Sequence, residues 1–394
     1  MATPPRLRPS AYQRAKRIAD RYLSRLSQLV SSPLVVEEHE LAPVPIKAVC
    51  PVPTNLSMVP EGFLRFYQET FSQVAPDFRQ VVYRLQNVNV AWHGTVLAGL
   101  RVFTPSLPGP EYEQEFTGLF LLRQLRSRRV AELADVPVGL VFNSWSGNYF
   151  HWIAEVLPRL AILRKIQPDC VVLLPGPKPP EYILRTVEAF GFQRTYIIMP
   201  GELVLVRQLW MPVRPGRAGY MAPSLVQEVR EQIMSSLQIQ LHSAVKASRW
   251  VYVSRSRQQW RQLTNEAEVV AILQRYGFET VYFEELSFVE QVRTMYETAI
   301  FIGIHGANMT NILFMTPGTH AIEMLSETYL NPSYLSMAAS IGVLYSVVPS
   351  KLGSPPNVEH NYADITVDPA SVEQVIRPLC KARYVATVPD NEVC

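Results

Sequence analysis

The sequence predicts an α/β protein made of two Rossmann-like domains. Its 394 residues exceed what one ordinary hydrophobic core accommodates, so two domains are expected. A content of 48% hydrophobic and 18% charged residues is typical of a soluble globular protein. Strand-like and helix-like runs alternate twice, over residues 138–198 and 250–348. This alternation predicts parallel sheets that are covered by helices on both faces.

The first half is expected to begin with irregular structure and then to alternate. The proline-rich residues 33–60 predict loops and edge strands. Residues 81–102 predict a β-hairpin, because their alternating pattern turns at Trp92-His93-Gly94. The alternation then gives strands over 138–142, 170–174 and 195–198, with helices over 148–166 and 181–190.

The second half is expected to follow a linker over residues 212–223, which are rich in proline and glycine. Asn265 and Glu268 have the spacing of a capping box, which predicts the start of a helix. The expected strands are 250–254, 279–283, 299–304, 320–324 and 343–348, and further helices are expected over 287–297, near 308 and over 332–340. The predicted organisation is a basic amphipathic helix over 1–30, Rossmann-like domains over 31–212 and 224–370, and a tail or crossover segment over 371–394.

Composition and missing motifs exclude several classes of function. A net charge of +3 argues against a nucleic-acid partner. The cysteines and histidines lack the spacing of a zinc site, and neither a dinucleotide-binding glycine motif nor a P-loop occurs. No apolar run reaches the ~20 residues of a membrane span, and the first residues lack the apolar stretch of a signal peptide. A cytoplasmic location is therefore expected.

Residues 11–30 predict a helix with two different faces. Apolar side chains recur at helical spacing, and four arginines line the opposite side: Arg14, Arg17, Arg21 and Arg25. This pattern suits a helix that lies peripherally on the anionic inner face of a membrane. It also suits a surface helix that packs on its own domain, and the sequence leaves both interpretations open.

The sharpest motif is the run from Ile302 to Phe314, where an apolar strand is followed directly by a helix. In doubly wound sheets, ligands bind beyond the carboxyl ends of the strands, where helix N-termini present free N–H groups. Small residues there allow a phosphate to approach the backbone, and nearby polar side chains add donors. The residues expected to bind an anion are His305, Gly306, Ala307, Asn308, Thr310 and Asn311. A purely structural turn with a capping histidine is the alternative.

A second motif, Val253 to Arg261, follows another predicted strand and presents Ser254, Arg255, Arg257 and Arg261 to the same edge. Guanidinium groups bind phosphates bidentately and neutralise a departing diphosphate. Metal-dependent enzymes commonly use an Asp-x-Asp pair for this purpose, and the chain has none. No metal is therefore expected. Glu323 ends a further strand at this edge and could accept hydrogen bonds from ribose hydroxyls.

In the first half, Trp145 to Arg159 form an unusual polar segment. His151 and Glu155 are four residues apart, so they share one face of the predicted helix. Such a pair can accept a proton from a hydroxyl, or it can be an ordinary helix-surface pair. Asn148 is expected to cap the helix, and Asn148, Tyr149 and Trp152 are expected on the acceptor side of the site.

Together these motifs resemble glycosyltransferase family 61. The resemblance rests on residues 148–160, Tyr252 to Arg255, Arg261, Asn265-Glu266, residues 286–288, 304–311 and 317–319. It implies the GT-B architecture, with two Rossmann-like domains facing across a cleft, and an inverting, metal-independent transfer from a UDP-sugar. The first domain would then be the acceptor side and the second would bind the nucleotide sugar. Asn308 and Ile304 depart from residues that relatives often carry at these positions.

The resemblance also implies residue roles. Arg255, Arg261 and the turn from His305 to Asn311 would hold the nucleotide diphosphate, and Glu155 would be the catalytic base with His151 beside it. The expected partners are a nucleotide-sugar donor and a glycan or lipid-linked acceptor, as in bacterial capsular polysaccharide biosynthesis. Two alternatives stay open: a polysaccharide pyruvyl transferase of similar architecture, and a non-catalytic protein that binds sugar nucleotides.

Overall fold

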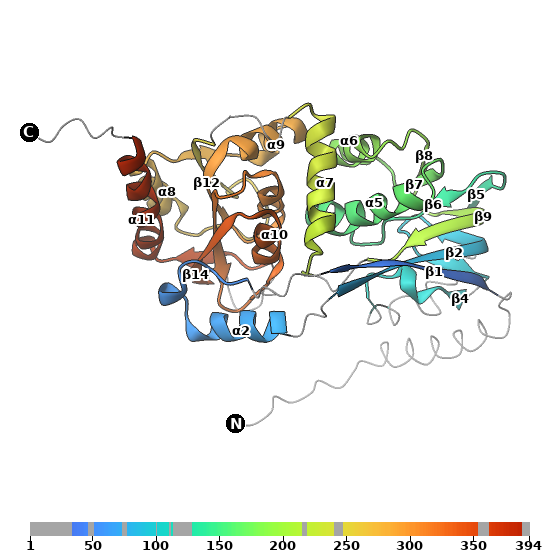
Figure 1. Ribbon diagram of the computed structural model, residues 1–394, viewed down its shortest axis with the longest axis horizontal. Coiled ribbons are helices and arrows are strands. Elements are labelled where there is room, and N and C mark those ends of the chain that lie inside the picture. The colour runs from blue at the N-terminus through green and yellow to red at the C-terminus, as the bar shows by residue number, and fades with distance from the viewer. Residues whose placement is uncertain are drawn as a thin grey trace, which may run out of the picture. The chain divides into compact units, whose positions relative to one another are not determined.

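The computed structural model describes residues 34–45, 51–72, 77–99, 101–109, 112, 128–214, 219–239, 247–353 and 362–387. The predicted amphipathic helix over 11–30 lies outside these residues, as do Cys50 and Cys394. The chain divides into two compact units (Figure 1). Unit 1 comprises residues 1–42 and 80–214, and unit 2 comprises 43–79 and 215–394.

The prediction of two mixed α/β bodies is confirmed, but their boundaries differ from those expected. Residues 43–79 belong to unit 2 rather than to the first domain. The expected tail over 371–394 contains most of a long helix, α11 (Pro369–Thr387), whose Val372 and Ile376 lie in the core of unit 2. Neither difference was visible in the local pattern, because both depend on contacts between residues far apart in the sequence.

The sheet of unit 1 is mixed rather than wholly parallel. Its main path runs β4-β3-β2-β9-β6-β7-β8, with β1 paired to β2 and β5 paired to β9. The strands are β1 (Val35–Pro45), β2 (Asp77–Ala91), β3 (Val96–Ala98), β4 (Arg101–Val102), β5 (Arg128–Leu133), β6 (Val138–Gly139), β7 (Val171–Pro175), β8 (Thr195–Ile198) and β9 (Glu202–Pro212). The hairpin of β2 and β3 is confirmed, and Gly94 in its turn has φ +84°. A side chain at Gly94 would meet the Phe142 carbonyl oxygen at 2.5 Å.

The parallel part of this sheet has a topological switch point between β9 and β6. From β6 the chain proceeds through β7 to β8 on one side, and then returns to place β9 on the other side of β6. Helices connect these strands: α4 (Tyr149–His151), a π-helical segment η4 (Trp152–Val156), α5 (Leu157–Ile166) and α6 (Glu181–Ala189). A short 3-10 turn, η2 (Thr104–Ser106), follows β4. Ligands of doubly wound sheets bind at the carboxyl ends of strands beside such a switch point.

Unit 2 contains a sheet in the order β11-β10-β12-β13-β14-β15, parallel except for β15. Its strands are β10 (Arg249–Val253), β11 (Glu279–Val281), β12 (Thr298–Ile304), β13 (His320–Ser326), β14 (Leu344–Leu352) and β15 (Ile365–Val367). Its helical elements are η1 (Leu56–Met58), α2 (Glu61–Ser72), α7 (Pro223–Ser236), α8 (Glu266–Arg275), η5 (Phe283–Glu285), α9 (Phe288–Glu297), η6 (Ala307–Phe314), α10 (Ser333–Ile341) and α11. The chain order places a switch point between β10 and β12.

The two faces of this sheet are covered by different helices. Ile302, Ile322 and Met324 pack with α8 and α11 in one apolar core, while α10 lies on the other face (Figure 1). The capping box expected at α8 does not form, because the Asn265 side chain instead bonds the backbone of Val367. A capping box is found at α9, between Ser287 and Glu290.

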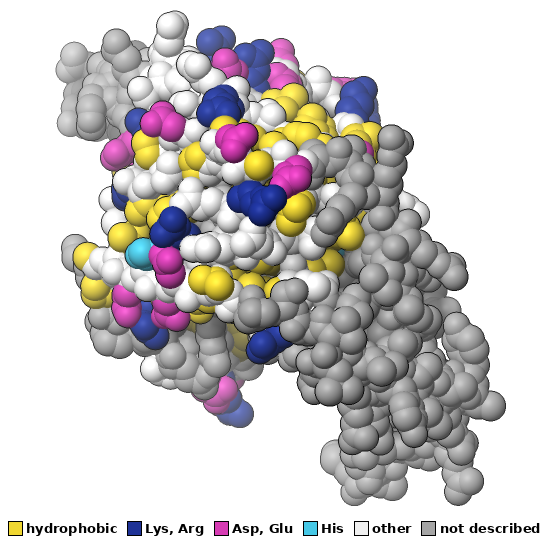
Figure 2. Space-filling model, turned by 90° about the vertical axis from the view of Figure 1, so that its right-hand side faces the viewer, with side chains coloured by type: hydrophobic (Ala, Val, Ile, Leu, Met, Phe, Trp, Pro, Cys, Tyr) yellow, Lys and Arg dark blue, Asp and Glu magenta, His cyan; other side chains and the backbone are white. Residues whose placement is uncertain are grey.

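On the face drawn in Figure 2, neither basic nor acidic side chains dominate the described surface. Basic and acidic side chains are interspersed there, with small apolar patches between them. None of the helices formed by the described residues is long and apolar enough to cross a bilayer.

Candidate functional site

The arginine and histidine motifs of unit 2 meet at the switch point of its sheet. Strand β10 ends at Val253 and β12 ends at Ile304, and the two strands pair in parallel, with Val253 opposite Gly303. Their carboxyl ends therefore lie side by side, so the loop after β10 and the turn after β12 project from the same edge. The structure thus brings together two motifs that lie far apart in the sequence.

Arg255 is the centre of this cluster. Only 7% of it is exposed, and its guanidinium donates to the carbonyls of Trp260 at 3.0 Å and Arg261 at 3.2 Å. Burial, followed by the charge of Arg261, lowers the pKa of Arg255 to about 10. A Cβ at Gly306 would lie 2.6 Å from Arg255 Nη1. Residue 306 must therefore lack a side chain if the guanidinium is to lie against the turn.

Arg261 adds a second positive charge to the same turn. It has a left-handed backbone, with φ +57°, a conformation that is costly for a residue with a side chain. Its Nη1 donates to the His305 carbonyl at 3.3 Å, while its Nε is buried without a hydrogen-bond partner among the described residues. Two close guanidinium groups repel each other, and an anion placed between them relieves the repulsion. The geometry fits a phosphate-binding cluster.

His305 is held from behind by a buried carboxylate. Its Nδ1 bonds Glu323, which is fully buried and also accepts from the Tyr345 hydroxyl. Tyr334 packs beside the imidazole, with ring centroids 5.2 Å apart, and donates to the Gly306 carbonyl at 2.6 Å. Burial, followed by the charge of Glu323, raises the pKa of Tyr345 well above its usual value. These tyrosines were not predicted, because only tertiary packing brings them to the turn.

Four residues expected to contact a donor are instead fully buried: Ser254, Thr310, Asn311 and Glu323. Ser254 bonds Glu266 and accepts from the Ser256 amide, so it orders the loop after β10. Asn311 donates to the Asn308 carbonyl within η6. These buried side chains support the cluster from the core of unit 2 and do not reach a surface where a ligand could contact them. Glu323 in particular cannot serve ribose hydroxyls, since both its oxygens are already bonded.

The exposed remainder of the cluster is smaller than the sequence suggested. Ala307 and Asn308 are half-buried at the start of η6 and stay available. Arg257 is directed elsewhere, since it pairs with Glu285 and its guanidinium lies 3.8 Å from the centre of the Tyr282 ring. A separate cavity of about 660 Å³ lies between β14, β15 and α11, and none of the predicted donor residues lines it.

In unit 1, the helix that carries His151 and Glu155 contains a π-helical segment. The Leu157 amide bonds the Trp152 carbonyl, five residues earlier. Pro158 follows, and a proline can neither donate an amide bond nor fit the carbonyl four residues before it. The segment before Pro158 therefore takes the wider π turn, a local irregularity that often accompanies functional sites. It includes Glu155.

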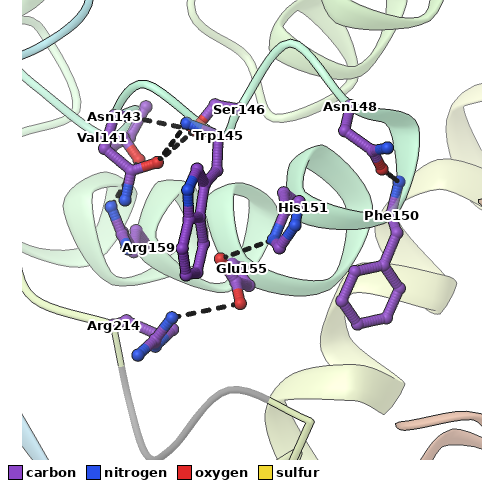
Figure 3. A network of polar contacts seen from close by, with 10 residues as sticks. All are labelled: Val141, Asn143, Trp145, Ser146, Asn148, Phe150, His151, Glu155, Arg159 and Arg214. Atoms are coloured by element: carbon purple, nitrogen blue, oxygen red, sulfur yellow. Dashed lines mark hydrogen bonds and ion pairs between the residues drawn. The ribbon is translucent and has the colours of Figure 1, made fainter. Parts of the chain in front are cut away.

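Glu155 is 5% exposed and has a basic side chain beside each of its oxygens. Oε2 lies 3.1 Å from His151 Nδ1, and Oε1 lies 3.2 Å from Arg214 Nη1 (Figure 3). The guanidinium of Arg159, buried nearby, donates to the Val141 carbonyl at 3.1 Å. Arg214 follows β9 and His151 follows β6, so this cluster lies at the switch point of unit 1.

These partners set the charge of the carboxylate. Burial by itself raises the pKa of Glu155, but the hydrogen bond with His151 and the charges of Arg214 and Arg159 outweigh it. The net pKa of Glu155 lies below its usual value. Glu155 is therefore ionised, well bonded and a weak base.

The expected acceptor-side residues are placed unevenly. Asn148 caps the helix, as predicted, and accepts from the Phe150 amide at 2.9 Å. Tyr149 is half-buried and packs edge-on against Tyr182. Trp152 is fully buried, and its indole donates to Thr186 at 2.9 Å, so it belongs to the core rather than to an acceptor surface.

Sequence reasoning missed Arg214 and Trp145 in this cluster. Arg214 lay in the predicted linker, where a single arginine carries no periodic signal. The Trp145 ring lies 5.0 Å from the His151 ring, and its position before the helix start could have drawn attention to it.

Comparisons with known proteins bear on both clusters. Residues 149–322 match the family described as Glycosyltransferase 61. An EGF domain-specific O-linked N-acetylglucosamine transferase of Drosophila melanogaster is 36% identical over 118 residues, which cover 29% of this chain and 22% of that protein. The protein of the same description in Rattus norvegicus is 34% identical over 92 residues, 22% of this chain and 17% of that protein.

A beta-1,2-xylosyltransferase of Oryza sativa subsp. japonica is 27% identical over 84 residues, 21% of this chain and 14% of that protein. The chain thus aligns with less than a quarter of the length of each of these relatives. The family match contains His151, Glu155, Arg255, Arg261 and the turn after β12. The similarity to glycosyltransferase family 61 thus extends over residues 149–322, which include the main residues of the polar clusters of both sheets.

Proposed function

We propose that the protein is an inverting, metal-independent glycosyltransferase that moves a sugar from a UDP-sugar to a hydroxyl of a glycan or a lipid-linked saccharide. The observation that carries the proposal is the pair of guanidinium groups, Arg255 and Arg261, that converge on Gly306 at the switch point of the unit 2 sheet. The match of residues 149–322 to the Glycosyltransferase 61 family supports glycosyl transfer as the chemistry.

The proposed donor site uses the exposed part of this cluster. Arg255 and Arg261 neutralise the diphosphate, and the backbone amides of Ala307 and Asn308 donate hydrogen bonds to its oxygens. His305, fixed by Glu323, presents its remaining ring nitrogen at the same edge. This arrangement places positive charge where negative charge develops as the diphosphate departs, which is the role otherwise taken by a metal ion.

The proposed reaction is a single displacement. The His151–Glu155 pair removes the proton of the acceptor hydroxyl, whose oxygen then bonds the anomeric carbon. The bond from that carbon to the phosphate oxygen breaks, and its electron pair remains on the diphosphate. Attack from the face opposite the leaving group inverts the anomeric centre. The GT-B architecture is part of this proposal, because each unit has its polar cluster at the carboxyl edge of its own sheet.

The first experiment is thermal unfolding with UDP, with and without EDTA. A ligand that binds the native state at one hundred times its Kd adds about 2.7 kcal/mol of stability, so UDP should raise the midpoint equally in both conditions. Arg255→Ala should abolish most of the UDP shift. Arg257→Ala is the matched control, because Arg257 is paired with Glu285 away from the cluster, and it should keep the shift.

The donor panel then includes UDP-N-acetylglucosamine and UDP-xylose, the sugars suggested by the names of the relatives, with release of UDP as the readout. A UDP shift that EDTA abolishes would contradict metal independence. Stabilisation by phosphoenolpyruvate but not by UDP would instead support the pyruvyl transferase. Retained UDP-sugar binding without turnover of any donor would favour a non-catalytic binding protein.

A further inference from the structure

The contacts around Glu155 separate the roles of the two members of the pair. Its oxygens are engaged by His151 on one side and by Arg214 on the other (Figure 3). With 5% of the residue exposed, a hydroxyl could reach the carboxylate only by displacing one of these two side chains. The carboxylate has no free oxygen to receive a proton from an acceptor.

His151 is placed differently. Its side chain is 25% exposed, while its Nδ1 is buried and lies 3.1 Å from Glu155 Oε2, a close polar contact without the alignment of a hydrogen bond. The exposed part of the side chain therefore lies on the rest of the ring, which includes Nε2. Because a carboxylate accepts and cannot donate, the neutral imidazole carries its hydrogen on Nδ1 and leaves a lone pair on Nε2.

The surroundings hold the ring in this orientation. The Trp145 and Phe150 rings lie 5.0 Å and 5.2 Å from the imidazole centroid. The π-helical segment and Pro158 fix the turn that carries Glu155, and Arg159 anchors the helix to the Val141 carbonyl. The imidazole is therefore oriented by a buried carboxylate that is itself oriented by Arg214.

We infer that His151 is the base of the proposed transfer, through Nε2, and that Glu155 is a positioning residue that sets its tautomer and stabilises its imidazolium. The inference rests on the proposed function and gives His151 and Glu155 separate roles in it. The acceptor O–H bond breaks as its proton moves to Nε2, the oxygen bonds the anomeric carbon, and the electron pair of the broken glycosidic bond stays on the diphosphate. The imidazolium then returns its proton to water.

The test is chemical rescue of His151→Ala, with UDP release from the donor that the wild-type protein turns over in the panel above. Removing a general base typically costs 10²–10⁴-fold in rate, so kcat should fall at least about 10²-fold. Added imidazole should raise the rate of the His151→Ala protein at least about tenfold, and added formate should not. His39→Ala is the matched control, since His39 also faces a glutamate, Glu37 at 3.7 Å, but lies on β1. It should keep full activity.

The positioning role of Glu155 is tested by separating its effect on kcat from its effect on UDP binding. Glu155→Gln should lower kcat strongly, because an amide can donate to Nδ1 and select the wrong tautomer, while the UDP shift should persist.

Two results would overturn the inference. One is a His151→Ala protein that folds and keeps kcat within about threefold of the wild type while Glu155→Gln is inactive, since Glu155 would then be the base. The other is a Glu155→Gln protein that folds and keeps kcat within about threefold of the wild type. A wild type that neither binds UDP nor turns over any donor is a different failure, because it removes the proposed function and the inference with it.

Discussion

At the scale of single residues, the donor cluster depends on a position with no side chain. Gly306 has an extended backbone that any residue can adopt, so its importance comes from space and not from conformational freedom. The Arg255 guanidinium occupies the place where a methyl group would stand.

Gly306→Ala should therefore weaken UDP binding at least about tenfold, by about 1.4 kcal/mol, because the new methyl group displaces the Arg255 guanidinium. Overall stability should change little, since only the end of a flexible side chain must move. Isothermal titration with UDP measures the effect. Gly62→Ala, where nothing lies within 4 Å of an added Cβ, is the control and should bind UDP normally.

His320 illustrates a histidine whose task is structural. It is 6% exposed, and its Nε2 lies 2.7 Å from the Ser346 hydroxyl. Burial lowers the pKa of His320 to about 4. The folded protein thus holds this imidazole neutral in a range where the unfolded chain protonates it.

The stability that His320 contributes is complete above the unfolded pKa of ~6.5 and is lost as pH falls toward the folded value of about 4. Linkage gives a loss of about 2 kcal/mol by pH 5. Urea unfolding at pH 7 and pH 5 should show this loss in the wild type. His320→Gln should show a smaller loss between the two pH values, and an equal loss would contradict the assignment.

At the scale of elements, the helix over residues 149–166 shows both the reach and the limit of sequence reasoning. Its periodicity and its Asn148 cap could be read directly, and so could the shared face of His151 and Glu155. The π-helical segment could not be predicted from the sequence. It depends on the backbone geometry that Pro158 requires together with the tertiary packing of Trp152. Arg214 was equally hidden, since its approach to Glu155 depends on the pairing of β9 with β6.

The same contrast holds in unit 2. Between β10 and β14, the order of strands and helices followed from the alternation of apolar runs, and the convergence of Arg255 with the turn after β12 followed from parallel strand ends. The elements α2, α7, β15 and α11 were not predicted. The burial of Thr310 and Asn311 did not follow, because η6 is a 3-10 helix that turns these side chains inward.

Pro158→Ala tests the role of the π-helical segment. Restoring an amide at position 158 favours an ordinary α-helical turn, which would rotate Glu155 and His151 relative to α5. We expect UDP release to slow at least about tenfold, since small displacements of catalytic groups are costly, with stability unchanged or raised. Pro223→Ala, at the first turn of α7 where no amide bond is lost, should leave the rate unchanged. A fully active Pro158→Ala protein would show that the segment is only a packing feature.

At the scale of the whole molecule, we extend the proposal to a peripheral membrane contact through residues 11–30. Their four arginines at helical spacing would face anionic lipid headgroups. Flotation with liposomes that contain anionic lipid should carry the full chain upward, and less so at high salt. A chain that lacks residues 1–30 should stay at the bottom. Equal flotation of both proteins would assign any lipid binding to another part of the chain.

The division of the chain between the units has a consequence for biosynthesis. Residues 51–72, with Phe63 and Tyr67 buried in unit 2, are made before residues 80–214 of unit 1, whereas the sheet they pack against is completed only near residue 367. On the ribosome, unit 1 can fold once β9 has been made, while the apolar side chains of residues 51–72 are still exposed. Slowed translation should therefore expose residues 51–72 to chaperones and proteases for longer than residues 128–214 of unit 1.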